Sequence, residues 1–272
     1  MTVLLPILQV DKPWGSAHLP APFATPEGRR IGEIWFEPPA CLPQLLVKYI
    51  FATDKLSVQV HPNDDQTLAR GLGRQGKEEC WLVIAAEPGA RLGIGFRQPI
   101  SAQAMRDAAL DGSIEDLLVW HPVVAGDFFY IPANTVHAIG AGVSVIEIQQ
   151  NSDITYRLFD YGRPRELHLD DGLAVALGQV YDLARWHRDV PPQGTVRLVD
   201  GPFFRLDRVQ GTPDASTLAR FGEGALLLVP VAGDVSVAGE TVPPGACALV
   251  GDATTISADA DALLLLTQPV GR

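Results

Sequence analysis

The strongest constraint on the fold is the dense spacing of glycine and proline, which cut the apolar sequence into short runs. The 272 residues include 26 Gly and 22 Pro. Short apolar runs closed by turn residues are typical of antiparallel strands in a sandwich or barrel. The sequence therefore predicts an all-β fold with a few helices. In chain order, the expected strands cover 45–50, 56–60, 81–85, 127–131, 143–148, 224–230, 233–238, 245–250 and 262–267.

Helical patterning is limited to four segments, which cover 63–72, 101–110, 113–118 and 170–177. Ser101 is a suitable N-cap for the second of them. The third opens with Ser113, and Asp116 follows three residues later, which is a capping-box pattern. The first three segments predict a small helical insertion, at about 63–75 and 98–118, in an otherwise β-structured module.

A module boundary is expected at 189–194, where Pro and Gly concentrate. All six histidines precede it, so the second module, 189–272, lacks the residues for a histidine-based metal site. The first module, 1–188, is expected to be the catalytic one. The second is expected to be a structural β module that closes or pairs with the first.

Composition excludes several classes of partner and favours a cytoplasmic protein. A net charge of −11 repels nucleic acid phosphates and anionic lipids, so a small anionic substrate would need a local cluster of Lys or Arg. The three cysteines (Cys41, Cys80 and Cys247) are too few and too scattered for a disulfide framework, and they fit a reducing compartment. The apolar start has no basic leader and predicts a strand, and no apolar run approaches the roughly 20 residues that span a bilayer.

Alternation along 56–61 places three polar side chains on one face of a strand. Ser57, Gln59 and His61 project together, and the intervening residues Leu56, Val58 and Val60 are apolar. This pattern suits a barrel lined by a polar site, and it equally suits an edge strand with its polar face in water.

A second segment, 126–137, has the spacing Gly126, five residues, Pro132, one residue, Asn134, two residues, His137. It resembles the second motif of cupin barrels, in which a tight turn delivers a histidine to an interior metal. Asn134 stands where that family usually has glycine, so this position is expected to need φ > 0, which Asn tolerates next best.

Two adjacent glutamates, Glu78 and Glu79, precede an apolar strand, and only one of them can point inward. Periodicity does not decide which. Two His, one Glu and one Gln form a nitrogen and oxygen ligand set that suits Zn²⁺, Fe²⁺ or Mn²⁺. With the resemblance of 126–137 to a cupin motif, these residues predict a metallo-cupin (a jelly-roll β-barrel) of unknown reaction.

Several segments together resemble type I mannose-6-phosphate isomerase in its short bacterial form. The matching stretches cover 12–15, 32–35, 56–62, 76–81, 132–138 and 147–161, in the right order. The resemblance implies that Glu79 is the ligand, with Gln59, His61 and His137, and that the cofactor is one zinc ion per chain. It also implies the interconversion of mannose 6-phosphate and fructose 6-phosphate through a cis-enediol.

The resemblance further implies catalytic roles for Lys77, Glu147 and Arg157, and substrate binding by Lys48, Ser57 and Arg157. Arg157 is expected to stabilise charge or hold phosphate, because a guanidinium is a poor base at neutral pH. Without the resemblance, Lys48 could be a surface lysine, and Arg157 could pair with Asp153 or Asp160.

Two departures from the longer family members concern substrate preference and size. Ile139 stands where they carry a tyrosine, and their large helical domain is reduced to short segments. Two rival functions remain: another metallo-cupin enzyme of the iron dioxygenase type, and a non-catalytic sugar-phosphate-binding cupin. The expected assembly is a monomer or a homodimer.

Overall fold

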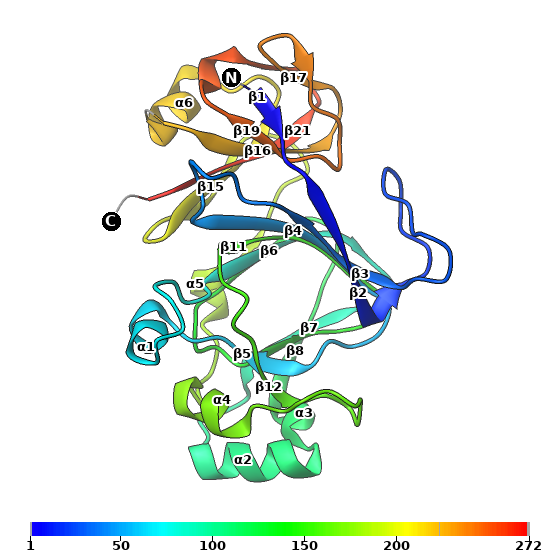
Figure 1. Ribbon diagram of the computed structural model, residues 1–272, viewed down its shortest axis with the longest axis vertical. Coiled ribbons are helices and arrows are strands. Elements are labelled where there is room, and N and C mark those ends of the chain that lie inside the picture. Colours follow the sequence, from blue (N-terminus) through cyan, green and yellow to red (C-terminus); the bar gives the residue numbers. More distant parts are fainter. Residues whose placement is uncertain (1, 223, 271–272) are drawn as a thin grey trace.

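The computed structural model describes residues 2–222 and 224–270. Two pairs of β-sheets are stacked along the long axis of the molecule, and short helices lie at the lower end (Figure 1). The expected all-β architecture with a few helices is confirmed. None of the helices in these residues is both long and apolar enough to span a bilayer.

The lower pair of sheets forms the first module. Its larger sheet contains, in spatial order, β13 (His187–Asp189), β9 (Asp127–Ile131), β6 (Glu79–Ala86), β11 (Val143–Gln150), β4 (Leu45–Ala52), β3 (Ile31–Phe36) and β2 (Ile7–Ser16). The facing sheet contains β12 (Tyr156–Phe159), β5 (Val58–Val60), β10 (His137–Ile139), β7 (Arg91–Phe96) and β8 (Leu118–Pro122).

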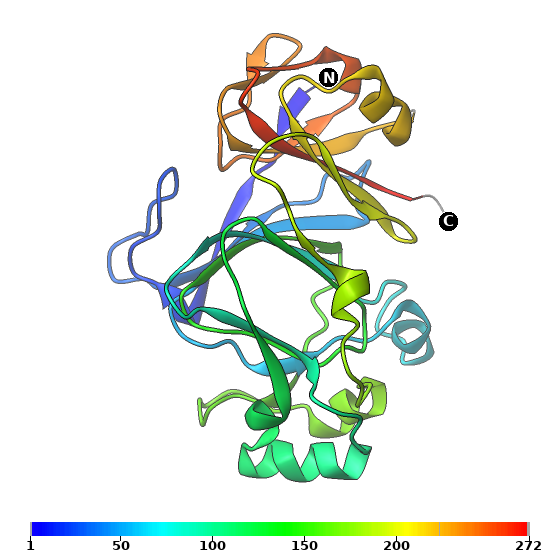
Figure 2. The same ribbon diagram turned by 180° about the vertical axis from the view of Figure 1, so that it is seen from behind.

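The upper pair forms the second module. One sheet contains β1 (Thr2–Leu4), β19 (Ala248–Val250), β16 (Leu226–Ala232), β21 (Leu263–Pro269), β15 (Phe204–Gln210) and β14 (Val196–Asp200), and the other contains β18 (Glu240–Thr241), β17 (Val235–Val237) and β20 (Ile256–Ala258). The chain enters this module after α5 (Leu183–Trp186) and the lower-sheet strand β13 that follows it, as the view from behind shows (Figure 2). Its first strand, β1, comes from the other end of the chain and pairs with β19.

The four expected helices are present: α1 (Asp64–Ala69), α2 (Ala102–Asp111), α3 (Ile114–Leu117) and α4 (Leu169–Val175). The capping-box prediction at Ser113 is wrong, because its hydroxyl makes no cap hydrogen bond and donates to Asp111 instead. A capping box occurs at α1, between Asn63 and Gln66. Two further helices, α5 and α6 (Ala215–Phe221), were not predicted, and Asp214 caps the second.

The core of the molecule is shared between the two modules. Alternate residues of β4, including Val47 and Tyr49, pack in one cluster with Phe204 and Leu227 of the upper sheet. The remaining residues of β4 face the interior of the lower module, so every residue of this strand is buried. The larger lower sheet is therefore covered on both faces, and Lys48, the one charged residue of β4, must point into the lower module.

Candidate active site

The two facing sheets bring four polar side chains to the interior of the lower module. Gln59 of β5 lies directly opposite His137 of β10, and His61 follows two residues after Gln59. Glu79 begins β6 in the facing sheet. Of the two alternatives left open for the polar face of 56–61, the interior one is found, since Ser57 and His61 are buried.

His61, Glu79 and His137 form a compact group whose ligand atoms all lie within 4.8 Å of one another. Glu79 Oε2 is 3.6 Å from His61 Nε2, and Glu79 Oε1 is 3.2 Å from His137 Nε2. All three side chains are completely buried or nearly so. Glu78 does not belong to this group, because its carboxylate is hydrogen-bonded with the Tyr130 side chain.

Both imidazoles are held in the orientation that a metal ligand requires. His61 Nδ1 lies 2.9 Å from the carbonyl oxygen of Ile154, and His137 Nδ1 lies 2.9 Å from that of Thr135. A carbonyl can only accept, so each Nδ1 carries the proton and each Nε2 presents its lone pair to Glu79.

Asn134 fastens the two histidine segments together. Its φ is +70°, as expected for the position at which the motif usually has glycine. Its backbone N–H and its side-chain amide both donate to the carbonyl oxygen of His61, at 2.8 and 3.2 Å. The turn before His137 is therefore tied to the backbone of the other histidine.

Burial and neighbouring charge set the protonation of this group. Burial, helped by the ammonium of Lys77, lowers the pKa of His61 to about 4, and burial also lowers that of His137. Burial alone would raise the pKa of Glu79, but Lys77 and the imidazoles hold it well below its ordinary value. Near neutral pH the group thus presents two neutral imidazoles and a carboxylate.

The carboxylate of Glu79 is the observation that fits a bound cation. Neither of its oxygens accepts a hydrogen bond of normal geometry from any described residue, although both are buried. Lys77 Nζ lies 2.7 Å from Oε2 as an ion pair, and this is its main compensation. A buried carboxylate with two imidazole lone pairs facing it suits a divalent ion such as zinc.

Gln59 lies beside this group, but as placed its amide nitrogen, which cannot bind a metal ion, faces the imidazole of His137. Its Nε2 is 3.3 Å from His137 Nε2, and its Oε1 accepts a hydrogen bond of 3.2 Å from the Ser57 hydroxyl. Rotating the amide by half a turn directs Oε1 to the imidazoles and lets Nε2 donate to Ser57. As placed, Nε2 donates to the unprotonated His137 Nε2; the rotated amide would set two acceptors against each other and suits the site only with a cation between them.

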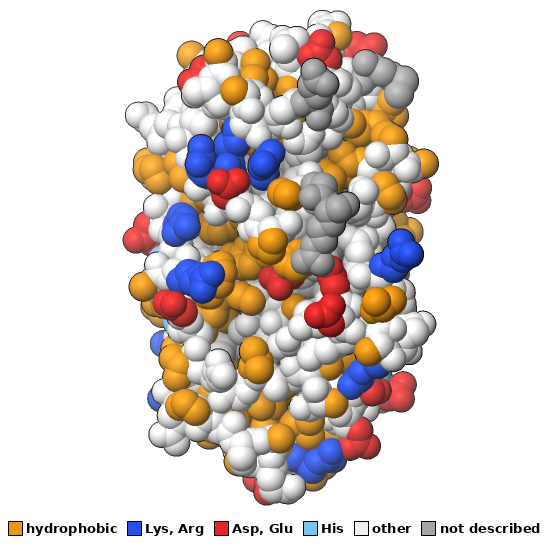
Figure 3. Space-filling model, turned by 90° about the vertical axis from the view of Figure 1, so that its left-hand side faces the viewer, with side chains coloured by type: hydrophobic (Ala, Val, Ile, Leu, Met, Phe, Trp, Pro, Cys, Tyr) orange, Lys and Arg blue, Asp and Glu red, His pale blue; other side chains and the backbone are white. Residues whose placement is uncertain are grey.

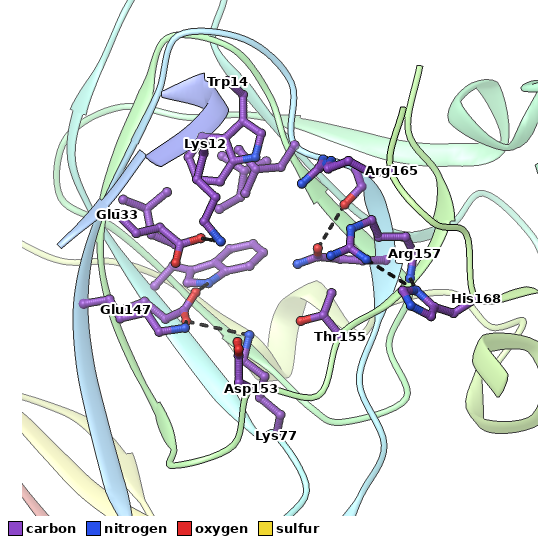
Figure 4. A pocket seen from close by; sticks show the side chains of 17 residues that line it. Lys12, Trp14, Glu33, Lys77, Glu147, Asp153, Thr155, Arg157, Arg165 and His168 are labelled. Carbon is purple, nitrogen blue, oxygen red and sulfur yellow. Dashed lines mark hydrogen bonds and ion pairs between the residues drawn. The ribbon is translucent and has the colours of Figure 1, made fainter. Parts of the chain in front are cut away.

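A pocket of about 320 Å³ opens beside the buried group (Figure 4). Lys77 links the two, since it lines the pocket and contacts Glu79 and His61. Six predicted site residues line the pocket: Lys48, Ser57, Gln59, Lys77, Glu147 and Arg157. A seventh, Glu79, lies behind Lys77.

Charged side chains of neighbouring strands alternate in sign along one wall. Glu147 Oε1 is 3.4 Å from Lys48 Nζ and 3.8 Å from Lys77 Nζ, and its Oε2 accepts a hydrogen bond of 3.0 Å from Trp81 Nε1. Oε1 accepts no hydrogen bond from the residues that the structure describes. Glu147 therefore has one oxygen fixed and one directed at two ammonium groups.

Comparison with known proteins places this architecture among the phosphomannose isomerases. The mannose 6-phosphate isomerase structure from Bacillus subtilis superposes with a TM-score of 0.81 at 21% identity, covering 98% of this chain and 99% of that one. A mannose 6-phosphate isomerase structure with zinc and yttrium gives 0.73 at 16%, covering 98% and 99%. The chain has the phosphomannose isomerase fold. The cupin-type architecture expected from the sequence is confirmed by this likeness.

Sequence similarity points to the same enzymes. Mannose-6-phosphate isomerase from Streptococcus mutans is 39% identical over 173 residues, which are 61% of this chain and 54% of the relative. ManA from B. subtilis is 42% identical over 137 residues, 48% of this chain and 43% of the relative. The chain thus spans about half the length of the curated relatives it matches. No protein-family model matches it.

Sequence reasoning missed part of the pocket. Arg165 and His168 line the pocket wall, although neither was singled out, and so do Trp14 and Glu33, which lie in segments quoted only for their resemblance. One signal was available: Arg157, Arg163 and Arg165 fall within nine residues of a chain whose net charge is −11.

Arg157 does not form the structural salt bridge that was its alternative role. In the described parts of the chain its guanidinium pairs with no carboxylate. Asp160 is occupied by Arg163 and Arg165. Lys48 is likewise not a surface lysine, since it is 3% exposed.

Proposed function

We propose that the protein is a metal-dependent aldose–ketose isomerase that interconverts mannose 6-phosphate and fructose 6-phosphate. The observation that carries this proposal is the His61–Glu79–His137 group behind a pocket lined by Lys77 and Glu147. The similarity to mannose-6-phosphate isomerases in sequence and fold supports it.

His61, Glu79 and His137 would hold one zinc ion, with the amide oxygen of Gln59 as a fourth ligand. The fixed Nδ1–H tautomers support this assignment, as do the buried oxygens of Glu79, which accept no hydrogen bond of normal geometry from the described residues. When bound, the ion acts as a Lewis acid toward the substrate's carbonyl and hydroxyl oxygens.

Proton transfer is assigned to Glu147 and Lys77. Glu147 Oε1 removes the proton from C2 of mannose 6-phosphate, the electron pair forms the C1–C2 double bond, and Lys77 protonates the C1 oxygen to give the cis-enediol. Lys77 then takes the proton of the C2 hydroxyl, the C2 carbonyl forms, and Glu147 returns its proton to C1. Both groups end in their starting states.

Geometry supports this division of roles. Trp81 fixes Glu147 Oε2 and leaves Oε1 as the open acceptor, 3.4 Å from Lys48 Nζ and 3.8 Å from Lys77 Nζ. The carboxylates of Glu147 and Glu79 raise the pKa of Lys77 and outweigh the effect of its burial, so it enters the reaction as an ammonium donor. Lys48, Ser57 and Arg157 would contact the sugar phosphate, and Arg157 would stabilise its charge.

A coupled assay of mannose 6-phosphate conversion tests the function, before and after chelation and after zinc is restored. We expect activity to disappear with the chelator and to return with zinc. The variant His137→Ala should lose both zinc and at least about 100-fold in turnover, because one ligand is removed from a catalytic metal. The matched control His18→Ala, at an exposed histidine, should retain both.

Two results would point elsewhere. Oxygen consumption by the iron-loaded protein, without isomerisation, would favour a dioxygenase-type cupin. Binding of mannose 6-phosphate by the folded, zinc-loaded protein without turnover would favour a sugar-phosphate-binding protein. The cytoplasmic location, the monomeric or dimeric state and the division of the chain near residue 189 stay predictions.

A further inference from the structure

The imidazole of His61 is oriented by a carbonyl group in the loop that joins β11 to β12. His61 Nδ1 lies 2.9 Å from the carbonyl oxygen of Ile154, and residues 151–155 of that loop belong to no helix or strand. The other histidine, His137, is oriented from within its own turn, by the carbonyl oxygen of Thr135. The tautomer of His61 therefore depends on a separate segment of the chain being held in place.

A buried amide fastens this loop. Gln149 of β11 is completely buried and lies directly opposite Glu79 in the strand pairing. Its Nε2 donates two hydrogen bonds of 2.7 Å, one to the carbonyl oxygen of Gln150 and one to that of Ser152. Because both carbonyls can only accept, these contacts determine the orientation of the amide.

Ser152 connects the Gln149 amide to Ile154. The backbone N–H of Ser152 donates to the carbonyl oxygen of Gln150 at 2.7 Å, and its hydroxyl oxygen accepts the backbone N–H of Ile154 at 3.4 Å. Two hydrogen bonds thus join the Gln149 amide to the backbone of Ile154, whose carbonyl meets His61. The loop is closed on itself at the point where it reaches the metal-site histidine.

The oxygen of the Gln149 amide is poorly satisfied by comparison with its nitrogen. Oε1 is buried and accepts no hydrogen bond from any residue that the structure describes. A buried amide oxygen without a donor destabilises the fold. An apolar side chain of similar length would avoid that cost, so the amide is explained by what its nitrogen holds in place.

We propose that Gln149 is a positioning residue for the metal site: its amide holds the loop at Ile154, and the Ile154 carbonyl then fixes the Nδ1–H tautomer of His61. The inference rests on the proposed function for the role of His61 as a metal ligand. An imidazole binds a metal ion through its unprotonated nitrogen, so Nε2 is available only while the proton stays on Nδ1. Groups that orient a metal-ligating histidine typically contribute about 10–100-fold to metal affinity.

The test compares Gln149→Met with Gln268→Met, since methionine is similar in length and has no donor. Gln268 is also a buried glutamine whose Nε2 donates to a backbone carbonyl, that of Ala225 at 3.2 Å, but it lies in β21 of the upper module. Two quantities are measured: the zinc affinity by competition with a chelator, and the tautomers of His61 and His137 by ¹⁵N NMR of the metal-free protein labelled at histidine. Circular dichroism verifies that both variants are folded.

We expect both imidazoles of the wild type to be in the Nδ1–H form. Gln149→Met should weaken zinc binding about tenfold or more and give His61 a mixture of tautomers, with His137 unchanged. Gln268→Met should leave the zinc affinity and both tautomers as in the wild type. A general loosening of the site would affect both histidines alike, so a change confined to His61 identifies the path through Ile154.

Three results would overturn the inference: an unchanged zinc affinity in Gln149→Met, an unchanged tautomer of His61, or equal changes at the two histidines. Ser152→Ala decides the matter if Gln149→Met does not fold, because it removes the acceptor of the Ile154 N–H and leaves Gln149 in place. That hydrogen bond is long, so the loss of zinc affinity should be smaller, about threefold, and the tautomer should again change at His61 alone. No change at His61 in Ser152→Ala would then contradict the positioning role.

Failure of this inference is distinguishable from failure of the proposed function. An active, zinc-dependent wild type whose zinc affinity and His61 tautomer survive Gln149→Met retains the function and loses the positioning role. A wild type that binds zinc without isomerase activity, and whose affinity and tautomer change only in Gln149→Met, retains the positioning role and loses the reaction. A wild type with no measurable zinc binding contradicts the positioning role, because there is then no metal site for Gln149 to serve.

Discussion

Two lysines of the pocket wall, Lys12 and Lys48, are each matched by a carboxylate on a neighbouring strand. Lys48 of β4 lies directly opposite Glu147 of β11, and Glu33 of β3 is reached by Lys12 of β2. Removing such charges from water costs several kcal/mol unless each has a close partner. These ion pairs therefore offset the cost of placing charged side chains inside the lower module. On the outer face drawn in Figure 3, several Lys and Arg side chains also lie beside Asp or Glu.

Glu33 gives a test of this pairing through the pH dependence of stability. Burial by itself would raise its pKa, but Lys48 and Lys12 outweigh burial and hold the pKa below its ordinary value of 4.5. A carboxyl whose pKa is lowered by folding stabilises the protein above the unfolded-state pKa. That contribution is lost as the pH falls through the folded-state pKa.

The free energy of unfolding should therefore differ most between wild type and Glu33→Gln above about pH 5, and the difference should shrink below about pH 4.5. Urea unfolding of both proteins between about pH 3.5 and 7 measures it. A difference that stays constant, or that grows on acidification, would contradict the assigned direction of the pKa shift.

At the scale of elements, short strands and capped helices hold the site in place. β5 has three residues, yet its alternation sets Gln59 and His61 toward the interior between apolar neighbours. The helices α2, α3 and α4 cover the outer side of the smaller lower sheet, where Met105, Ile114 and Val175 pack in one cluster with Val58 and Val60 of β5. The back of the strand that carries the site is thereby sealed from water.

The N-cap of α2 can be compared with the failed capping box of α3. Ser101 accepts the backbone N–H of Ala104 at 3.1 Å, whereas Ser113 makes no cap hydrogen bond. Ser101→Ala should lower the free energy of unfolding by about 1 kcal/mol, and Ser113→Ala by less than about 0.5 kcal/mol. Chemical denaturation of both variants measures the difference, and equal losses would count against the cap assignment. The proposed isomerase activity should be unaffected in both.

At the scale of the whole molecule, the shared core makes the two modules one cooperative unit. Phe204 of β15 is fully buried and packs in the same cluster as Phe36 and Tyr130 of the lower module. The N-terminal strand β1 pairs with β19 of the upper sheet and so forms a second connection between the two modules. A chain ending near residue 188 would expose this apolar surface.

Scanning calorimetry of the intact protein should therefore show a single unfolding transition. Phe204→Ala should move that whole transition downward, with a loss of about 3–5 kcal/mol, because a large side chain is removed from a closed core. Leu110→Ala, at a side chain 66% exposed, should leave it in place. Two separate transitions, only one of them shifted by Phe204→Ala, would show that the modules unfold independently.

The amino-acid sequence by itself determined the features that depend on local periodicity and turn chemistry. Alternation placed Gln59 and His61 on one face, and the spacing before His137 anticipated the positive φ of Asn134. Glycine and proline limited the chain to short strands. These properties follow from neighbouring residues alone, so they can be deduced without the fold.

Only the tertiary structure decided what depends on pairing between distant segments. It brought Glu79, not Glu78, to the histidines, directed Lys48 inward, and folded the loop that carries Arg165 back against Arg157. It also joined β1 to β19 and merged two apolar faces into one core. Strand order and register fix these contacts, and neither is encoded in the periodicity of a single segment.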